Sequence, residues 1–244
     1  MMSFVARITG LLVLLVAGQA PGAPLVMNSG EQAVTLLELY TSQGCSSCPP
    51  AERWLNDFVA DENLWRTFVP VAFHVDYWDY IGWKDPYGQP ANGERQRALA
   101  RTANARTVYT PGIFANGREW RGWALGMAPP AGRTQPGSLA VRVADGELEA
   151  HFAADAEPWL LNVAVLGFGI DTPVTRGENR NRTLRQEFVS LVHVSHPSAD
   201  GHWRVPLPAY DKGESSRRGL AVWVSRPDQP APVQATGGWL DDRR

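Results

Sequence analysis

The two cysteines of this chain, Cys45 and Cys48, constrain its fold more than any other feature. They are the only cysteines in 244 residues, and their C-x-x-C spacing lets both sulfurs reach bonding distance within one helical turn. An apolar run of strand length, residues 34–40, precedes the pair. Residues 51–60 follow it and place their apolar side chains on one helical face. A cysteine pair between a strand and a helix is typical of a redox site.

Strand and helix signals then alternate in the order strand, helix, strand, helix, strand, strand. The segments that carry them are, in turn, residues 34–40, 51–60, 68–75, 91–106, 113–115 and 119–123. Asn116-Gly117, between the last two, is a strong two-residue hairpin signal. A right-handed crossover makes the first two strands parallel. This order predicts a thioredoxin-like α/β domain over residues 31–127.

The composition changes after Met127. Residues 128–137 are rich in proline and glycine, which is typical of a linker. Beyond them we find only strand signals, separated by frequent turns such as Asp145-Gly146. We therefore expect a small β-sandwich-like domain over residues 138–244. The predicted fold class is α/β plus all-β, in two domains.

The first 22 residues have the features of a signal peptide. Arg7 is their only charged side chain, and the apolar run over residues 8–17 is short for a membrane span. Small residues favour cleavage after Gly22. We therefore expect a periplasmic or secreted protein that is not stably inserted in a membrane after cleavage. Disulfides persist in that compartment.

The thiolate of Cys45 is the expected nucleophile, because a helix N-terminus carries partial positive charge. Pro49 and Pro50 place the start of the helix near Ser47. Cys45 would then be exposed in the preceding turn, with Cys48 more buried. We predict that Cys45 attacks a partner disulfide and that Cys48 resolves the mixed disulfide.

Glu38 and Asp76 are alternative proton shuttles for Cys48. Glu38 lies inside an apolar strand, where a carboxylate is costly unless it is paired or protonated. The alternative is that its side chain reaches solvent. Asp76 ends the second predicted strand. A carboxyl of raised pKa accepts a thiol proton near neutral pH.

Four further residues are candidates for substrate binding. Thr110 and Pro111 open the third predicted strand, where the thioredoxin fold has a cis proline facing the redox pair. We therefore predict a cis bond there, although most X–Pro bonds are trans. Trp78 and Trp83 belong to the aromatic and acidic loop after the second strand, which should lie beside the Cys45 loop. These aromatic residues either form a substrate rim or anchor the loop.

Four motifs are long or distinctive enough to compare with known families. Residues 38–50 read ELYTSQGCSSCPP, residues 73–86 read FHVDYWDYIGWKDP, residues 109–111 read YTP, and residues 176–184 read RGENRNRTL. Together they resemble the DUF1223 family of exported bacterial thioredoxin-like proteins. The resemblance runs from residue 34 to near the C-terminus. It implies a thioredoxin-like domain followed by a β-domain, and it implies no particular substrate.

We predict a thiol-disulfide oxidoreductase of the cell envelope. Its substrates would be protein or small-molecule disulfides and thiols, with a further redox partner and without cofactor or metal. The net charge of −2 argues against a nucleic-acid partner. One alternative is a binding or scaffold protein with a structural disulfide, although so short a loop removes little chain entropy. The other is a copper-handling protein that uses the thiols and His74.

Overall fold

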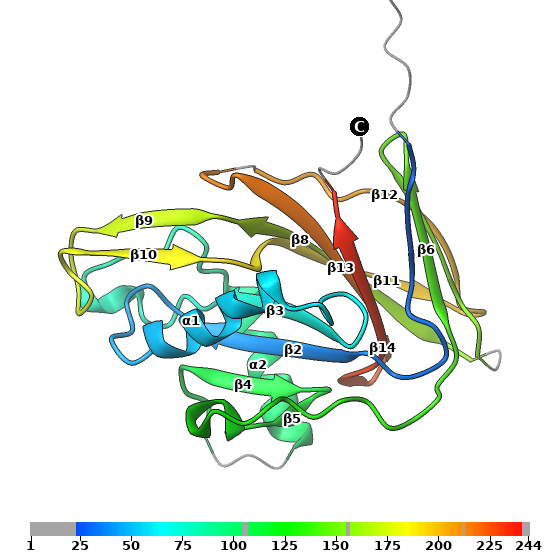
Figure 1. Cartoon of the computed structure of the whole chain (residues 1–244), viewed down its shortest axis with the longest axis horizontal. Helices are drawn as coiled ribbons and strands as arrows, with labels where there is room; N and C mark the ends of the chain where they lie inside the picture. The colour runs from blue at the N-terminus through cyan, green and yellow to red at the C-terminus, as the bar shows by residue number, and fades with distance from the viewer. Residues whose placement is uncertain (1–22, 104–106, 155–156, 212, 241–244) are drawn as a thin grey trace, which may run out of the picture.

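The computed structural model describes residues 23–103, 107–154, 157–211 and 213–240 (Figure 1). The predicted signal peptide, residues 1–22, lies outside the described residues. Within them the chain forms three β-sheets and two α-helices. Neither of these helices is long and apolar enough to cross a membrane.

The largest sheet has eight strands in the order β14-β13-β8-β11-β3-β2-β4-β5. In that order the strands are β14 (Gln229–Trp239), β13 (Arg217–Arg226), β8 (Trp159–Phe168), β11 (Val189–Ser198), β3 (Phe68–His74), β2 (Thr35–Thr41), β4 (Gly112–Ala115) and β5 (Arg118–Glu119). The central strands β2 and β3 are parallel, with Thr41 opposite His74. Every residue of both strands is buried. Burial on both faces explains their nearly continuous apolar runs.

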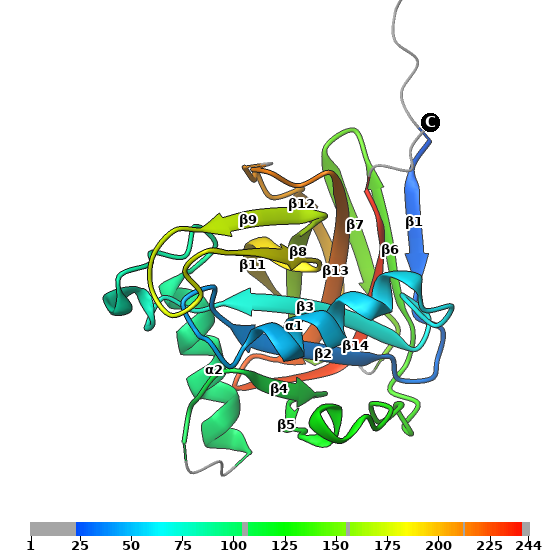
Figure 2. The ribbon, with the colours of Figure 1, turned by 60° about the vertical axis from the view of Figure 1, so that its left-hand side comes forward.

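Two smaller sheets complete the β-structure. A four-stranded sheet has the order β1-β6-β7-β12 and packs over the β13–β14 end of the large sheet (Figure 2). Its strands are β1 (Leu25–Asn28), β6 (Leu139–Ala144), β7 (Glu147–Phe152) and β12 (His202–Pro206). A two-stranded hairpin consists of β9 (Ile170–Val174) and β10 (Arg182–Gln186).

The two α-helices lie on opposite faces of the large sheet (Figure 1). They are α1 (Pro49–Asn56) and α2 (Pro90–Thr102). Both begin with proline in the first turn, where the missing N–H group would have no helical partner in any case. Short 3₁₀ helices occupy Asp57–Ala60, Asp79–Ile81 and Gly122–Leu125.

The predicted fold class, a thioredoxin-like domain followed by a small β-sandwich-like domain, is wrong. Strands β2, β3, β4 and β5 occur in the expected order, but they do not form a sheet of their own. β3 continues the sheet on its other side through β11, where Val189 pairs in parallel with Ala72. β8, β13 and β14 extend it further. The C-terminal half therefore adds its longest strands to the sheet that was assigned to the N-terminal half.

The edge of β3 that faces away from β2 is buried, so its backbone groups need hydrogen-bond partners from another strand. The backbone N–H of Ala72 donates to the carbonyl oxygen of Phe188 over 2.8 Å. Buried N–H groups need such partners. The apolar pattern of β3 indicates that the strand is buried, but it does not indicate which strand lies beside it.

The main core is shared by both halves of the chain. Leu36, Leu39 and Phe73 from the N-terminal half cluster with Phe188 and Trp223 from the C-terminal half. All five side chains are buried. Separating the halves would expose this surface to water.

We predict that residues 31–127 do not fold cooperatively on their own, because they lose the partners of β3 and half of the shared core. Thermal unfolding followed by circular dichroism compares this fragment with residues 23–244. The longer chain should show one sharp transition and the fragment none. A fragment that unfolds cooperatively near the temperature of the full chain would contradict the shared-core interpretation.

Candidate functional site

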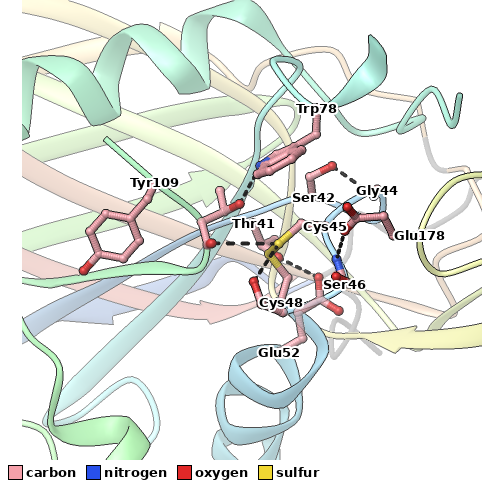
Figure 3. Close-up of a disulfide and its surroundings, with 12 residues drawn as sticks. Thr41, Ser42, Gly44, Cys45, Ser46, Cys48, Glu52, Trp78, Tyr109 and Glu178 are labelled. Carbon is pink, nitrogen blue, oxygen red and sulfur yellow. Dashed lines mark hydrogen bonds between the residues drawn. A yellow bond between two sulfur atoms is a disulfide. The ribbon is translucent and has the colours of Figure 1, made fainter. Parts of the chain in front are cut away.

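Cys45 and Cys48 form a disulfide in the loop between β2 and α1 (Figure 3). Their Cα atoms are 5.5 Å apart. The backbone N–H of Cys45 donates to Ser42 over 3.1 Å, and that of Cys48 donates to Cys45 over 3.2 Å. These tight turns lead directly into the helix, which begins at Pro49. Sequence and structure agree on this local arrangement.

Both cysteines are buried, so the prediction that Cys45 is exposed is wrong. Its exposed fraction is 2%, and that of Cys48 is 0%. The Sγ atom of Cys45 lies 3.3 Å from the Ser47 hydroxyl and 3.8 Å from the Thr110 carbonyl oxygen. Ser46 and Ser47, between the cysteines, are exposed. A partner therefore meets the two serines first.

Of the predicted substrate-binding residues, Thr110 contacts Cys45 directly and Trp78 contacts Thr110. The Thr110–Pro111 peptide bond is cis, as predicted. Trp78 donates its indole N–H to the Thr110 hydroxyl over 2.6 Å, which fixes the segment that lies against the sulfur. Trp83 instead donates to the Gln43 side chain over 3.0 Å. It therefore supports the cysteine loop through Gln43.

Glu38 lies on the opposite face of the sheet from α1. Successive side chains of a strand alternate between faces, so Glu38 and Thr41 point in opposite directions. Thr41 contacts α1, whereas Glu38 accepts two hydrogen bonds from Arg95 of α2, over 2.7 and 3.0 Å. Tyr40 donates a third bond over 2.8 Å. Glu38 is thus the buried, paired carboxylate that the sequence suggested, but the structure does not bring it to Cys48.

Asp76 lies two residues after the end of β3, in a turn, and its side chain is half-buried. Its backbone carbonyl accepts the N–H of Asp79 over 3.0 Å. The structure thus places Asp76 within this turn.

Glu52 is the carboxyl that sequence reasoning missed. Its backbone N–H donates to the Cys48 carbonyl over 3.1 Å, the bond of a helical turn. Side chains four positions apart on a helix are neighbours, so Glu52 lies on the Cys48 face of α1. Figure 3 shows its side chain extending toward Thr41 and the disulfide. The i, i+4 spacing from Cys48 was the available sequence signal.

Glu52 is 4% exposed, and its carboxyl is hydrogen-bonded within the protein. Thr41 donates to it over 2.7 Å and the Gln186 amide over 3.1 Å. Burial raises its pKa above the ordinary value, and the positive charge of His74 opposes part of that rise. A carboxyl of raised pKa beside a cysteine suits proton exchange with the thiol.

The β9–β10 hairpin holds the cysteine loop from the C-terminal half. Asn179 is fully buried, and its amide donates to the carbonyl oxygens of Gln43 and Cys45, each over 2.9 Å. Glu178 accepts the backbone N–H of Ser46 over 2.9 Å. The 176–184 motif thus carries direct partners of the cysteine loop.

Beneath the site, His74 and Asp85 form a buried pair. His74 Nδ1 lies 2.7 Å from Asp85 Oδ2, and both side chains are fully buried. Burial alone would lower the pKa of His74, but the Asp85 carboxylate raises it above its ordinary value. Burial likewise favours protonation of Asp85, but His74 holds the Asp85 pKa below its ordinary value. Each partner therefore favours the charged form of the other.

The copper-handling alternative depended on His74 acting together with the thiols. The structure gives the ring another partner, Asp85. Within the described ranges, no three His, Cys, Asp or Glu side chains are grouped so that they could hold a metal ion.

A family model described as a protein of unknown function (DUF1223) matches residues 36–225. The chain belongs to the DUF1223 family. This confirms the resemblance seen in the motifs, while the thioredoxin-like fold that it implied is corrected above. No curated protein matches the chain.

Two solved structures resemble the family member described here. One is a crystal structure of a protein from Agrobacterium tumefaciens, with a TM-score of 0.65 and 25% identity, covering 88% of this chain and 98% of that one. The other is HBP35 of Porphyromonas gingivalis, with a TM-score of 0.56 and 15% identity, covering 88% of this chain and 78% of that one. The second likeness concerns the fold alone.

The His74–Asp85 pair predicts a pH dependence of stability. A raised folded-state pKa means that His74 stabilises the fold below its ordinary pKa of 6.5, and that this contribution is lost as pH rises through the folded value. The lowered pKa of Asp85 stabilises the fold above its ordinary value of 3.8 and is lost as pH falls. The full contribution is therefore present between these two values.

Asp85→Asn keeps the side-chain shape and removes the charge. Urea unfolding at pH 5.5 should show a loss of about 3–5 kcal/mol in the free energy of unfolding, as for a broken buried pair. The loss should be smaller at pH 9. An equal loss at both pH values would mean that the pair contributes through packing rather than charge.

Proposed function

We propose that this DUF1223 protein is a thiol-disulfide oxidoreductase of the cell envelope. The observation that carries the proposal is the Cys45–Cys48 disulfide between β2 and α1, with a buried carboxyl on the same helical face as Cys48. A three-residue separation lets the bond open and close with little change in the chain around it. The helix N-terminus favours the thiolate form.

In the oxidised protein, a thiolate of a partner dithiol attacks Cys45 Sγ. The Cys45–Cys48 bond breaks, and Cys48 leaves as a thiolate that takes a proton from the protonated Glu52. The second partner thiolate then attacks the partner sulfur of the mixed disulfide and releases Cys45. Two electrons pass from the partner dithiol to the cysteine pair. The reverse sequence reduces a partner disulfide, with the Glu52 carboxylate accepting the Cys48 proton.

The surroundings of Cys45 support its role as the attacked and attacking sulfur. The hydroxyl of Ser47, 3.3 Å away, can donate to a Cys45 thiolate and stabilise it. Cys48 has no exposed surface, whereas 2% of Cys45 is exposed. Protein or small-molecule thiols and disulfides are the proposed partners, reached by way of the exposed Ser46–Ser47 edge.

A periplasmic or secreted location is part of the proposal. It is supported by the signal-peptide features of residues 1–22 and by a redox pair that needs an environment in which disulfides persist.

Trapping tests the division of roles. Cys48→Ser should accumulate mixed disulfides through Cys45, because the resolving sulfur is gone, whereas Cys45→Ser should accumulate almost none. Non-reducing electrophoresis with a model disulfide peptide measures both, because the remaining thiolate attacks the peptide disulfide and expels one of its thiolates. Insulin reduction by the wild-type chain, with dithiothreitol as the electron donor, measures turnover. Equal trapping by the two variants would overturn the assigned roles.

The scaffold alternative makes a different prediction. If the disulfide is only structural, the wild-type chain fails to reduce insulin and neither single-serine variant traps a partner. The double variant Cys45→Ser, Cys48→Ser is the matched control for both assays. Its thermal unfolding reports how much the disulfide contributes to stability.

Glu52→Gln tests the proton carrier. It keeps the side-chain shape and an acceptor for Thr41, but it cannot take the Cys48 proton. Loss of a positioned acid or base typically slows a proton-transfer step by roughly 100-fold. Stopped-flow measurement of mixed-disulfide resolution should show this fall, while alkylation of the reduced Cys45 stays nearly unchanged.

Two matched carboxyl-to-amide variants complete the test. Glu38→Gln and Asp76→Asn should leave the resolution rate near that of the wild type. If one of them slows resolution and Glu52→Gln does not, that residue is the shuttle. If none of the three has an effect, water carries the proton.

A further inference from the structure

The mechanism above leaves the His74–Asp85 pair without a role. Asp85 is fixed by more than its contact with His74, because it also accepts the backbone N–H of Gln43 over 2.8 Å and that of Tyr87 over 2.9 Å. With Asp85 held in this way, Nδ1 of His74 is the donor and the orientation of the ring is set. Gln43 belongs to the cysteine loop, so the pair is tied directly to the redox site.

The other ring nitrogen of His74, Nε2, is buried and has no hydrogen-bond partner among the described residues. A buried polar group without a partner is costly, and such groups often have a functional role. His74 pairs in register with Thr41 on the neighbouring parallel strand. Both side chains therefore leave the same face of the sheet, the face covered by α1. The Thr41 hydroxyl on this face donates to Glu52 over 2.7 Å.

We propose that His74 is a positioning residue for the proton carrier: its positive charge, maintained by Asp85, stabilises the Glu52 carboxylate, the form that accepts the proton of Cys48. The proposal rests on the exchange chemistry proposed above. It makes the His74–Asp85 pair the element that sets the pH range in which the cysteine pair exchanges.

Opposing influences on Glu52 show why such a charge is needed. Burial favours its protonated form, and a Glu52 that stays protonated at neutral pH cannot accept a proton. Of the surrounding groups, His74 on β3 favours the carboxylate through its charge, and Thr41 on β2 and Gln186 on β10 favour it through hydrogen bonds. The carboxylate of Asp85 opposes ionisation of Glu52. His74 is the one cation among these four.

The titration of Glu52 is the direct readout. Infrared difference spectra of reduced and oxidised protein follow its carboxyl band with pH, and Glu52→Gln assigns the band. His74→Gln should move the midpoint upward by about one pH unit, which is a tenfold fall in carboxylate below the midpoint. Resolution of the mixed disulfide at those pH values should slow by a similar factor. Alkylation of Cys45 should not change.

His193→Gln is the matched control. His193 stacks on Trp223 and contacts Phe73, the neighbour of His74 on β3. Adjacent strand residues point to opposite faces, so His193 lies on the α2 face, away from Glu52. This variant should leave the Glu52 midpoint where it is in the wild type. An equal displacement by both histidine variants would overturn the proposal.

Asp85→Asn gives a second, independent test, because a buried His74 without its carboxylate loses its proton more readily. It should displace the Glu52 midpoint in the same direction as His74→Gln. If both variants fail to fold, NMR of the wild-type protein decides: the His74 ring signals should shift at the Glu52 midpoint. If the His74 ring signals do not respond, or if the folded variants keep the wild-type Glu52 midpoint, the proposal is overturned.

The experiments distinguish a failure of the role proposed for His74 from a failure of the proposed function. Failure of mixed-disulfide trapping rejects the exchange chemistry, whatever the titration shows. A normal trapping result with an unchanged Glu52 midpoint rejects only the role of His74.

Discussion

The parallel pairing of β3 with β11 is the interaction on which the rest of the structure depends. It joins the strands that flank the cysteine loop to the long strands of the C-terminal half, through the bond from Ala72 to Phe188. Because β10 immediately precedes β11 in the chain, this pairing also fixes where the β9–β10 hairpin lies. The hairpin then reaches the cysteine loop with Asn179 and Glu178. The surroundings of the cysteine loop are thus completed by residues more than a hundred positions away.

This dependence explains which parts of the site could be predicted from sequence. The strand, the cysteine turn and the helix after it are local, and their signals, including the prolines at the helix start, were sufficient. The cis Thr110–Pro111 bond was predicted by analogy with the cis proline of the thioredoxin fold, together with its place before a strand. The domain architecture did not follow, because strand neighbours far apart in sequence leave no local pattern. The fully buried β3 was compatible with either arrangement.

Glu38 and Glu52 show that the sequence of one element does not determine which carboxyl lies beside Cys48. The position of Glu38 in an apolar strand predicts that it is buried, and it is fully buried. The alternation of side chains along the strand, however, places it on the α2 face, where it forms an ion pair with Arg95 and accepts a hydrogen bond from Tyr40. The burial of Glu52 is not evident from its own position in the sequence, because a charged residue in a short helix is usually solvated. Its burial comes from Gln186 and Thr41, contacts that only the assembled sheet provides.

The arrangement around Cys48 is best understood as a balance between burial and charge. Burial keeps Cys48 away from solvent, but it also makes the Glu52 carboxylate harder to form. A single cation on the same face relieves that penalty without opening the site to water. His74 can supply this charge only because Asp85 is fixed by two backbone N–H groups, one of them from the cysteine loop. Loop conformation and site electrostatics are therefore coupled through one carboxylate.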